Sequence, residues 1–289
     1  MPERPKYFNS SEAANILGVN VSTIKRWTDD GRLQCIKTAG GHRKFAISHL
    51  AEFIQENKQK ASRVNVFPVE GEEDLEISYH IMKGDFKFLR NRVLGDALNC
   101  NRERIHKILN GLYLGQFPLH KIYDSLITPV MHRIGDLWED EEITVTEEHF
   151  ASQIIRDSII RLQSAMQIPS EKIGTALCLN FSSELHDIAL KMVDHLLEIR
   201  GYKVLFSGQI TPLYKLESIF EKFNPDRVYI SSTVVSEISL AQLELNHLLE
   251  LCEDNQAEVY VGGRGMDRLN IDHSAITARL KSFKEVYQT

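Results

Sequence analysis

Three short segments in the second half of the chain combine residue types that suit a ligand site. They are Glu184-Leu-His186-Asp-Ile-Ala189, Ser231-Ser-Thr233 and Gly262-Gly263. A neutral imidazole such as that of His186 can bind a metal through one ring nitrogen, and an acceptor on the other nitrogen raises its basicity. Glycines let a ligand approach the backbone where a Cβ would clash. Taken alone, His186 would more simply be a capping or exposed loop histidine, so its candidacy depends on the other two segments.

The chain after Pro169 alternates short apolar runs with helical stretches. The runs cover residues 175–180, 203–206, 227–231 and 258–261, and the helical stretches cover about 187–199, 212–223 and 239–253. This alternation predicts βαβ units and an α/β, doubly wound, Rossmann-like domain over residues 169–289. Ligands bind at the carboxyl ends of the strands in such sheets. Because each segment follows or ends a run, we expect all three on one rim.

Residues 74–168 have a helical pattern throughout and predict an all-α bundle of four or five helices. Breaks fall near 84–85, 99–101, 116–118 and 139–144. In the last helix the apolar residues are spaced as one stripe: Ala151, Ile155, Ile159, Leu162 and Met166. Residues 61–73 show no sustained period and predict a flexible linker.

Residues 1–60 predict a small winged helix-turn-helix domain, of α type with a short wing. Two helical patterns flank Gly18, which permits the positive φ of the turn, and Ser10 or Ser11 could cap the first helix. Two extended stretches around Gly40-Gly41 predict the wing, and residues 47–54 predict a third helix.

The charge is distributed unevenly between this domain and the rest of the chain. Residues 1–62 hold 10 Lys and Arg against 6 Asp and Glu, a net +4, so the whole-chain charge of −6 leaves −10 for residues 63–289. The positive net charge of this N-terminal domain favours DNA as its partner. The candidate contacts are Ser22, Thr23, Lys25 and Arg26 for the major groove, and His42 and Arg43 of the wing for phosphate or the minor groove. Lys25 could equally be a solvated surface charge.

The three segments resemble the cobalamin-binding signature of methionine synthase and the methylmalonyl mutases. That signature is an acidic residue-x-His-x-x-Gly, then Ser-x-Leu, then Gly-Gly. The 41 residues between Ala189 and Ser231 and the 28 between Thr233 and Gly262 agree with its spacing. Ala189 replaces the glycine of the signature and Thr233 its leucine, and the methyl group of Ala189 would crowd the loop under the corrin.

The resemblance implies a role for each matching residue. His186 would be the lower axial ligand of cobalt, and Glu184 would be the acceptor on its other nitrogen. Ser231 would bond the nucleotide tail of the cofactor, with Thr233 beside it, and Gly262 and Gly263 would let the tail approach the backbone.

A second motif lies upstream, where nine residues separate Trp138 from Glu148-His149. Trp-x9-Glu-His resembles the motif of the CarH/LitR class of MerR-type regulators, and Thr38-x-Gly-Gly-His-Arg43 resembles the wing of the MerR superfamily. By this resemblance Trp138 would cover the upper face of the corrin and Glu148 would contact the adenosyl group. His149 could take cobalt after the alkyl group leaves. Trp138 as core filler and Glu148-His149 as an ordinary helix start are the simpler alternatives.

The resemblance covers nearly the whole chain and implies a regulator rather than an enzyme. It implies a repressor that binds double-stranded operator DNA, with adenosylcobalamin as cofactor, or methylcobalamin, held between the bundle and the α/β domain. In the family, adenosylcobalamin promotes a tetramer in the dark and light disperses it, so we expect self-association as a dimer or tetramer. Two alternatives stay open: a corrinoid carrier protein for methyl transfer, and a regulator whose pocket no longer binds cobalamin.

The lack of a recognisable targeting segment and the spacing of the cysteines predict a cytoplasmic protein. No apolar run reaches the roughly 18 residues of a membrane span, and residues 1–6 lead into no apolar stretch. The four cysteines have no C-x-x-C spacing, so we expect buried thiols in a reducing compartment.

Overall fold

The computed structural model describes residues 7–56, 71–211, 213 and 215–289. Two compact units make up the chain. The first comprises Met1–Phe117 and Pro129–Ile155, and the second comprises Pro118–Thr128 and Arg156–Thr289. The division of the sequence into three modules stays a prediction. In the described part, no helix is long and apolar enough to cross a membrane.

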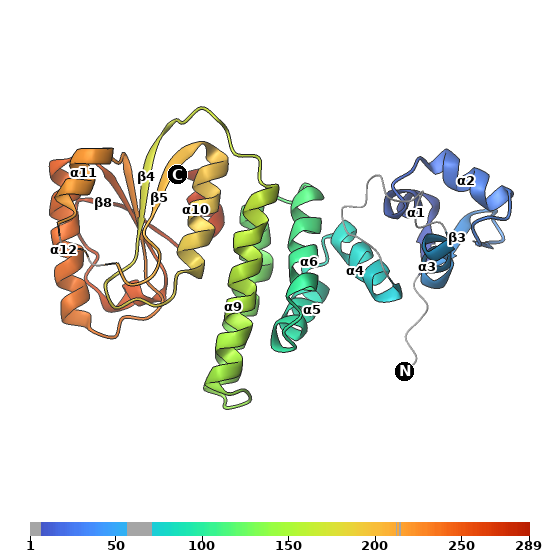
Figure 1. The fold of residues 1–289 in the computed structure, drawn as a ribbon, viewed down its shortest axis with the longest axis horizontal. Helices are drawn as coiled ribbons and strands as arrows, with labels where there is room; N and C mark the ends of the chain where they lie inside the picture. Colours follow the sequence, from blue (N-terminus) through green and yellow to red (C-terminus); the bar gives the residue numbers. More distant parts are fainter. Residues whose placement is uncertain (1–6, 57–70, 212, 214) are drawn as a thin grey trace. The chain divides into compact units, whose positions relative to one another are not determined.

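The first unit begins with a winged helix-turn-helix (Figure 1). Its elements are β1 (Tyr7–Asn9), α1 (Ser10–Ile16), α2 (Val21–Asp29), β2 (Ile36–Lys37), β3 (Arg43–Ala46) and α3 (Ile47–Glu56). The wing consists of β2 and β3, and β3 also pairs with β1, a strand that the sequence pattern did not predict. Gly18 has a φ of +64°, as the turn requires.

The cap of α1 differs from the prediction. Asn9, rather than Ser10 or Ser11, precedes the helix, and its side chain accepts hydrogen bonds from the backbone of Ser11 and Glu12. The Glu12 side chain in turn accepts from the Asn9 backbone. In this reciprocal capping box both side chains accept from backbone N–H groups at the start of the helix, which a serine cap alone does not achieve.

The helix α4 (Glu72–Lys83) packs into the core of the winged-helix domain. Leu75 is fully buried in the same apolar cluster as Phe8 and Phe53, and Tyr79 packs edge-on against Phe8. The helix also contacts α5 (Phe86–Leu98) and α6 (Arg102–Leu114), so its predicted place in the bundle stays a prediction. Residues 72 and 73, which the sequence pattern predicts as linker, belong to this helix. The rest of the predicted linker, apart from Gly71, lies outside the described residues.

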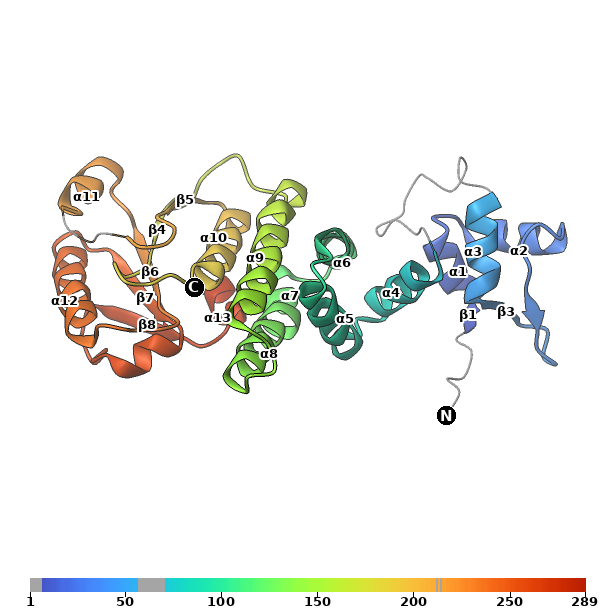
Figure 2. The same ribbon diagram turned by 60° about the horizontal axis from the view of Figure 1, so that its bottom comes forward.

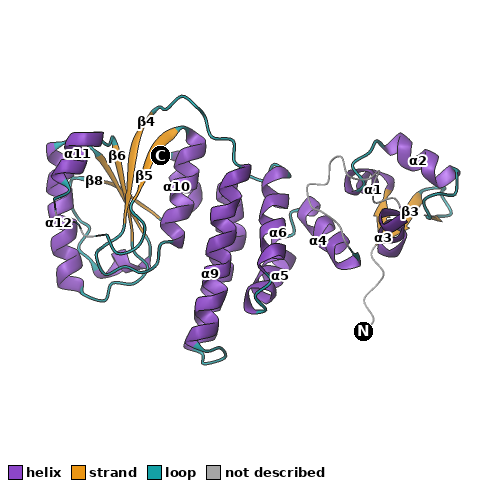
Figure 3. Ribbon diagram, viewed as in Figure 1, coloured by secondary structure: helices purple, strands orange, loops and turns teal. Residues whose placement is uncertain are grey.

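The remaining helices lie in the region predicted as a bundle; Figure 3 draws these and all other described helices in purple. They are α5 (Phe86–Leu98), α6 (Arg102–Leu114), α7 (Leu119–Ile122), the π-helical turn η1 (Tyr123–Ile127), α8 (Thr128–Glu139), α9 (Val145–Leu162) and the short 3-10 turn η2 (Gln163–Ala165). The predicted breaks fall between these helices, and the five residues of the predicted stripe are all buried. Amphipathic packing therefore decides the form of this region.

The second unit contains a five-stranded parallel sheet in the order β5-β4-β6-β7-β8. Its elements are β4 (Gly174–Leu179), α10 (Ile188–Arg200), β5 (Tyr202–Phe206), α11 (Glu217–Phe223), β6 (Arg227–Ser231), α12 (Ile238–Asp254), β7 (Glu258–Gly262), the 3-10 turn η3 (Arg264–Arg268), β8 (Ile276–Leu280) and α13 (Phe283–Gln288). The sequence pattern predicted the first four strands but neither β8 nor α13. It also began the helix before β6 at residue 212, whereas α11 begins at Glu217.

Helices cover both faces of this sheet. α10 and α13 lie on one face, and α11 and α12 lie on the other (Figures 1 and 2). The chain leaves β4 for one face and β6 for the other, so the switch point of the topology lies between these neighbouring strands.

The cysteines do not all follow the prediction. Cys178 and Cys252 are buried, but Cys35 is half-buried and Cys100 is exposed. Burial raises the pKa of the Cys252 thiol to about 12.

Candidate functional site

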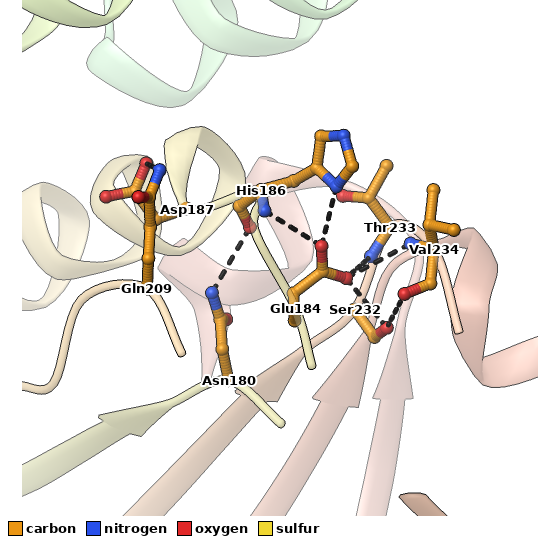
Figure 4. A network of polar contacts seen from close by, with 8 residues as sticks. All are labelled: Asn180, Glu184, His186, Asp187, Gln209, Ser232, Thr233 and Val234. Atoms are coloured by element: carbon orange, nitrogen blue, oxygen red, sulfur yellow. Dashed lines mark hydrogen bonds and ion pairs between the residues drawn. The ribbon is translucent and has the colours of Figure 1, made fainter. Parts of the chain in front are cut away.

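The central pair of the site is His186 and Glu184, on the loop between β4 and α10 (Figure 4). Nδ1 of His186 lies 2.6 Å from Oε1 of Glu184, which also accepts a hydrogen bond from the His186 backbone at 2.8 Å. The histidine side chain is more than half exposed, whereas that of Glu184 is buried. With Nδ1 turned toward the carboxylate, Nε2 is the nitrogen through which the ring would reach a metal.

Glu184 joins this loop to the loop that follows β6. Its Oε2 accepts from the hydroxyl of Ser232 at 2.9 Å and from the backbone of Thr233 and Val234 at 2.6 and 3.0 Å. Burial favours the neutral acid, but the hydrogen bonds from His186, Val234 and Ser232 outweigh it and lower the pKa of Glu184. A buried carboxylate is thereby held ionised at the switch point of the sheet.

The serine that contacts this network is Ser232, and the predicted contact of Ser231 with the nucleotide tail stays a prediction. Ser231 is the last residue of β6, pairs with Gly262 in the sheet and is buried. Ser232, one residue later, binds Glu184, and Thr233 contributes its backbone N–H while its side chain is exposed. Side chains alternate across a strand, so a shift of one residue exchanges the two faces.

The two glycines have different surroundings. At Gly263, φ is +92° and an added Cβ would lie 2.0 Å from the carbonyl oxygen of Ser232. At Gly262 it would lie 3.3 Å from the carbonyl oxygen of Leu280. Close approach of the protein's own backbone therefore demands glycine at 263, whereas the predicted contact of both glycines with a cofactor tail stays a prediction.

Sequence reasoning missed two residues beside His186. Asn180, directly after β4, is buried and donates from Nδ2 to the His186 carbonyl oxygen at 3.2 Å. Asp187 is also buried and forms an ion pair with Arg156 of α9. The position of Asp187 next to His186, after a strand, was the signal available in the sequence. Ala189 lies in the first turn of α10 and is half-buried.

The upstream motif lies in the first unit. Trp138, near the end of α8, is 46% exposed and borders an open hollow of about 330 Å³ with Ile143, Val145 and Glu147. Glu148 accepts a hydrogen bond from Ser152 at 2.6 Å, and His149 Nε2 lies 3.6 Å from the Glu148 carboxylate. An exposed indole is a flat apolar surface of the kind that covers a large planar ligand.

The candidate DNA contacts divide into exposed and engaged side chains. Ser22, Lys25, Arg26 and His42 are exposed, and Thr23 is half-buried. Arg43 donates from Nη2 to Asp29 at 2.5 Å, which ties the wing to the end of α2. In this arrangement Arg43 positions the wing, and phosphate would have to compete with Asp29 for it.

Two families match parts of the chain. Residues 7–58 match the helix-turn-helix domain family, and residues 89–163 match the B12 binding domain family. The chain is 24% identical over 281 residues to the HTH-type transcriptional repressor CarH of Myxococcus xanthus, over 93% of this chain and 91% of that protein. It also resembles the monomethylamine corrinoid protein of Methanosarcina barkeri, with a TM-score of 0.55 and 13% identity, over 70% of this chain and 96% of that one. The latter likeness concerns the fold.

The winged helix, the B12-binding helices and the doubly wound sheet define a multidomain, B12-binding class of DNA-binding protein. Within that class, the chain is similar over nearly its whole length to a transcriptional repressor of the CarH type. This agrees with the fold class and the family that the sequence motifs indicated.

Proposed function

We propose that this protein is a repressor that senses cobalamin and is not an enzyme. The observation that carries the proposal is the pairing of His186 with the buried Glu184 at the carboxyl edge of the sheet. A carboxylate that engages one ring nitrogen fixes the tautomer and raises the basicity of the other, as second-shell acceptors do for metal-binding histidines. The donor set therefore fits cobalt.

In this proposal each candidate residue has one role. His186 would bind cobalt and Glu184 would orient its imidazole, while Ser231, Thr233, Gly262 and Gly263 would surround the nucleotide tail. Trp138, Glu148 and His149 would contact the cofactor, and His149 could serve as a further cobalt ligand. Alkyl cobalamins would supply a cobalt–carbon bond that light can break, and adenosylcobalamin is the form that we propose.

Operator DNA is the proposed macromolecular partner. The exposed Ser22, Lys25 and Arg26 on α2 and His42 on the wing are suited to groove and phosphate contacts. One winged helix buries little DNA surface, so specific binding requires several copies presented together. We therefore propose that the cofactor controls self-association into a dimer or tetramer, and that light reverses it.

The first experiment titrates purified protein with adenosylcobalamin in the dark and follows the absorption spectrum. We expect uptake with a histidine-ligated spectrum, which His186→Ala abolishes and His247→Ala, on the exposed part of α12, leaves unchanged. Uptake with an unchanged spectrum in His186→Ala would show that His186 does not ligate cobalt. No uptake by the parent protein would reject the proposal and favour the alternative in which the pocket no longer binds cobalamin.

The second experiment concerns assembly and DNA. Size-exclusion chromatography with a duplex of operator length is run with adenosylcobalamin in darkness and again after green illumination. A large complex in the dark that disperses in light supports a light-dependent repressor. An assembly state that neither cofactor nor light changes would contradict this part of the proposal and leave cobalamin binding as a separate question.

A further inference from the structure

Asp187 is the residue that precedes α10, yet its side chain does not cap that helix. It precedes α10 in the N-cap position, where aspartate commonly accepts hydrogen bonds from the first turn, but its side chain makes none there. A buried aspartate that gives up this interaction must be held by a different group.

That group is Arg156 of α9. Nε of Arg156 donates to Oδ1 of Asp187 at 2.8 Å and Nη2 donates to Oδ2 at 2.6 Å, a bidentate pair. The Nε2 of Gln209, on the loop after β5, approaches Oδ1 at 3.4 Å. The hydrogen bond to Asp187 outweighs burial and raises the pKa of Arg156, so the guanidinium stays charged over the ordinary pH range.

Both backbone groups of His186, the N–H and the carbonyl, are therefore held by hydrogen bonds. Its N–H and Nδ1 are bound to Glu184, and its carbonyl oxygen accepts from Asn180. Its next neighbour in sequence is bound to Arg156. Glu184 and Asn180 belong to the sheet edge, whereas Arg156 is an anchor on a helix outside the sheet (Figure 4 shows Asp187 turned away from Glu184).

We propose that Arg156 is a positioning residue: through Asp187 it holds the His186 loop on α9 and sets the direction of the imidazole toward the cofactor. The inference rests on the proposed function for the identity of the cofactor, but the anchoring of the loop is a property of the protein itself. Bidentate geometry fixes both the distance and the rotation of the carboxylate, which a single lysine contact does not.

The test compares Arg156→Gln and Arg156→Lys with a matched control, Arg279→Gln. Arg279 forms a single, exposed ion pair of 2.5 Å with Asp267, so the control removes an arginine–carboxylate pair of the same unit that does not involve the His186 loop. The first readout is amide hydrogen exchange of residues 184–190 in protein without cofactor. The second is the electron paramagnetic resonance spectrum of bound cob(II)alamin with ¹⁵N-labelled histidine, whose superhyperfine pattern reports coordination by a protein imidazole.

We expect Arg156→Gln to accelerate exchange in residues 184–190, to reduce the fraction of histidine-coordinated cobalt, and to weaken affinity for adenosylcobalamin about 10–100-fold. Arg156→Lys should recover part of the affinity, since it keeps the charge without the fork. Arg279→Gln should match the parent in all three measurements.

A buried carboxylate left without its partner could impair folding. The double variant Arg156→Gln with Asp187→Asn removes both charges, so it should fold while keeping the faster exchange and the loss of histidine coordination. Exchange and coordination equal to the parent in the folded variants would overturn the proposal. If the parent binds no cobalamin, the proposed function fails, and exchange in residues 184–190 still decides whether Arg156 anchors the loop.

Discussion

Oε1 of Glu12 lies 2.5 Å from Nζ of Lys83, so a helix in the winged-helix domain is bound to the end of α4. The other oxygen of Glu12 accepts from the Asn9 backbone in the capping box of α1. Burial alone would raise the pKa of Glu12, but the hydrogen bonds from Lys83 and Asn9 lower it. One carboxylate thus both caps the first helix of the DNA-binding domain and fixes α4 against it.

Leu75→Ala should destabilise the winged-helix domain although residue 75 lies beyond its third helix. Leu75 is fully buried in the core that contains Phe8 and Phe53, and such a truncation costs about 2–5 kcal/mol. Urea unfolding is followed by fluorescence in a Trp138→Phe background, which leaves Trp27 as the reporter. Lys83→Ala removes a half-exposed ion pair and should have a smaller effect. An unmoved Trp27 transition in Leu75→Ala would show that α4 is not part of this core.

Lys25→Ala should weaken binding to duplex DNA in a way that depends on salt. Lys25 is exposed on α2, and each phosphate contact that is lost lowers the slope of log affinity against log salt by about 1. Fluorescence anisotropy over a salt series measures the slope. Lys222→Ala, on α11 of the other unit, is the control and should leave it unchanged. Equal slopes for Lys25→Ala and the parent would identify Lys25 as a solvated surface charge.

Gly263→Ala should be far more damaging than Gly262→Ala. At 263 the new Cβ would overlap the Ser232 carbonyl and the residue would be held at positive φ, a strain of about 1–3 kcal/mol before the clash is counted. At 262 the neighbouring carbonyl has to yield by only a few tenths of an ångström. Urea denaturation monitored by circular dichroism compares the two variants. Similar midpoints would mean that the Ser232 loop can move aside.

The free energy of unfolding should decrease as the pH is lowered below neutrality, because of His195. It is fully buried, Tyr123 bonds its Nδ1 at 2.8 Å, and burial lowers its pKa to about 3. In the unfolded chain its pKa is about 6.5, so between these values the unfolded state binds one more proton. The free energy of unfolding should therefore decrease by about 1.4 kcal/mol per pH unit as the pH falls below about 6.5.

His195→Gln, which does not titrate, supplies the comparison for this pH dependence. Urea unfolding at a series of pH values from 7 to 5 should show a shallower slope in the variant than in the parent. If both proteins lose stability in parallel, His195 is not the group responsible.

The sequence predicted most of the fold because its signals are local. The helical stripe from Ala151 to Leu162 and the alternation after Pro169 depend on local spacing, and the structure confirms both, whereas Met166, predicted in the same helix, is buried beyond its end. The strand β8 and the helix α13 were missed because partly buried edge elements have weak apolar patterns.

In the candidate site, too, the local contact was predictable from the sequence and the long-range contact was not. Glu184 and His186 are two residues apart, so their contact is nearly dictated by the chain, and the motif located them. The contribution of Ser232 rather than Ser231 depends on which side chain turns toward Glu184 after β6, a matter of strand register that spacing in the sequence does not resolve.

By itself, then, the amino-acid sequence determined the class of each region, the order of the elements and the histidine with its carboxylate, because these follow from periodicity and short spacing. Only the tertiary structure decided that Leu75 of α4 packs into the winged-helix core and that Arg156 reaches Asp187 from 31 residues away. Contacts of that kind are set by the packing of whole elements, and side-chain burial and charge pairing between distant segments leave no regular pattern along the chain.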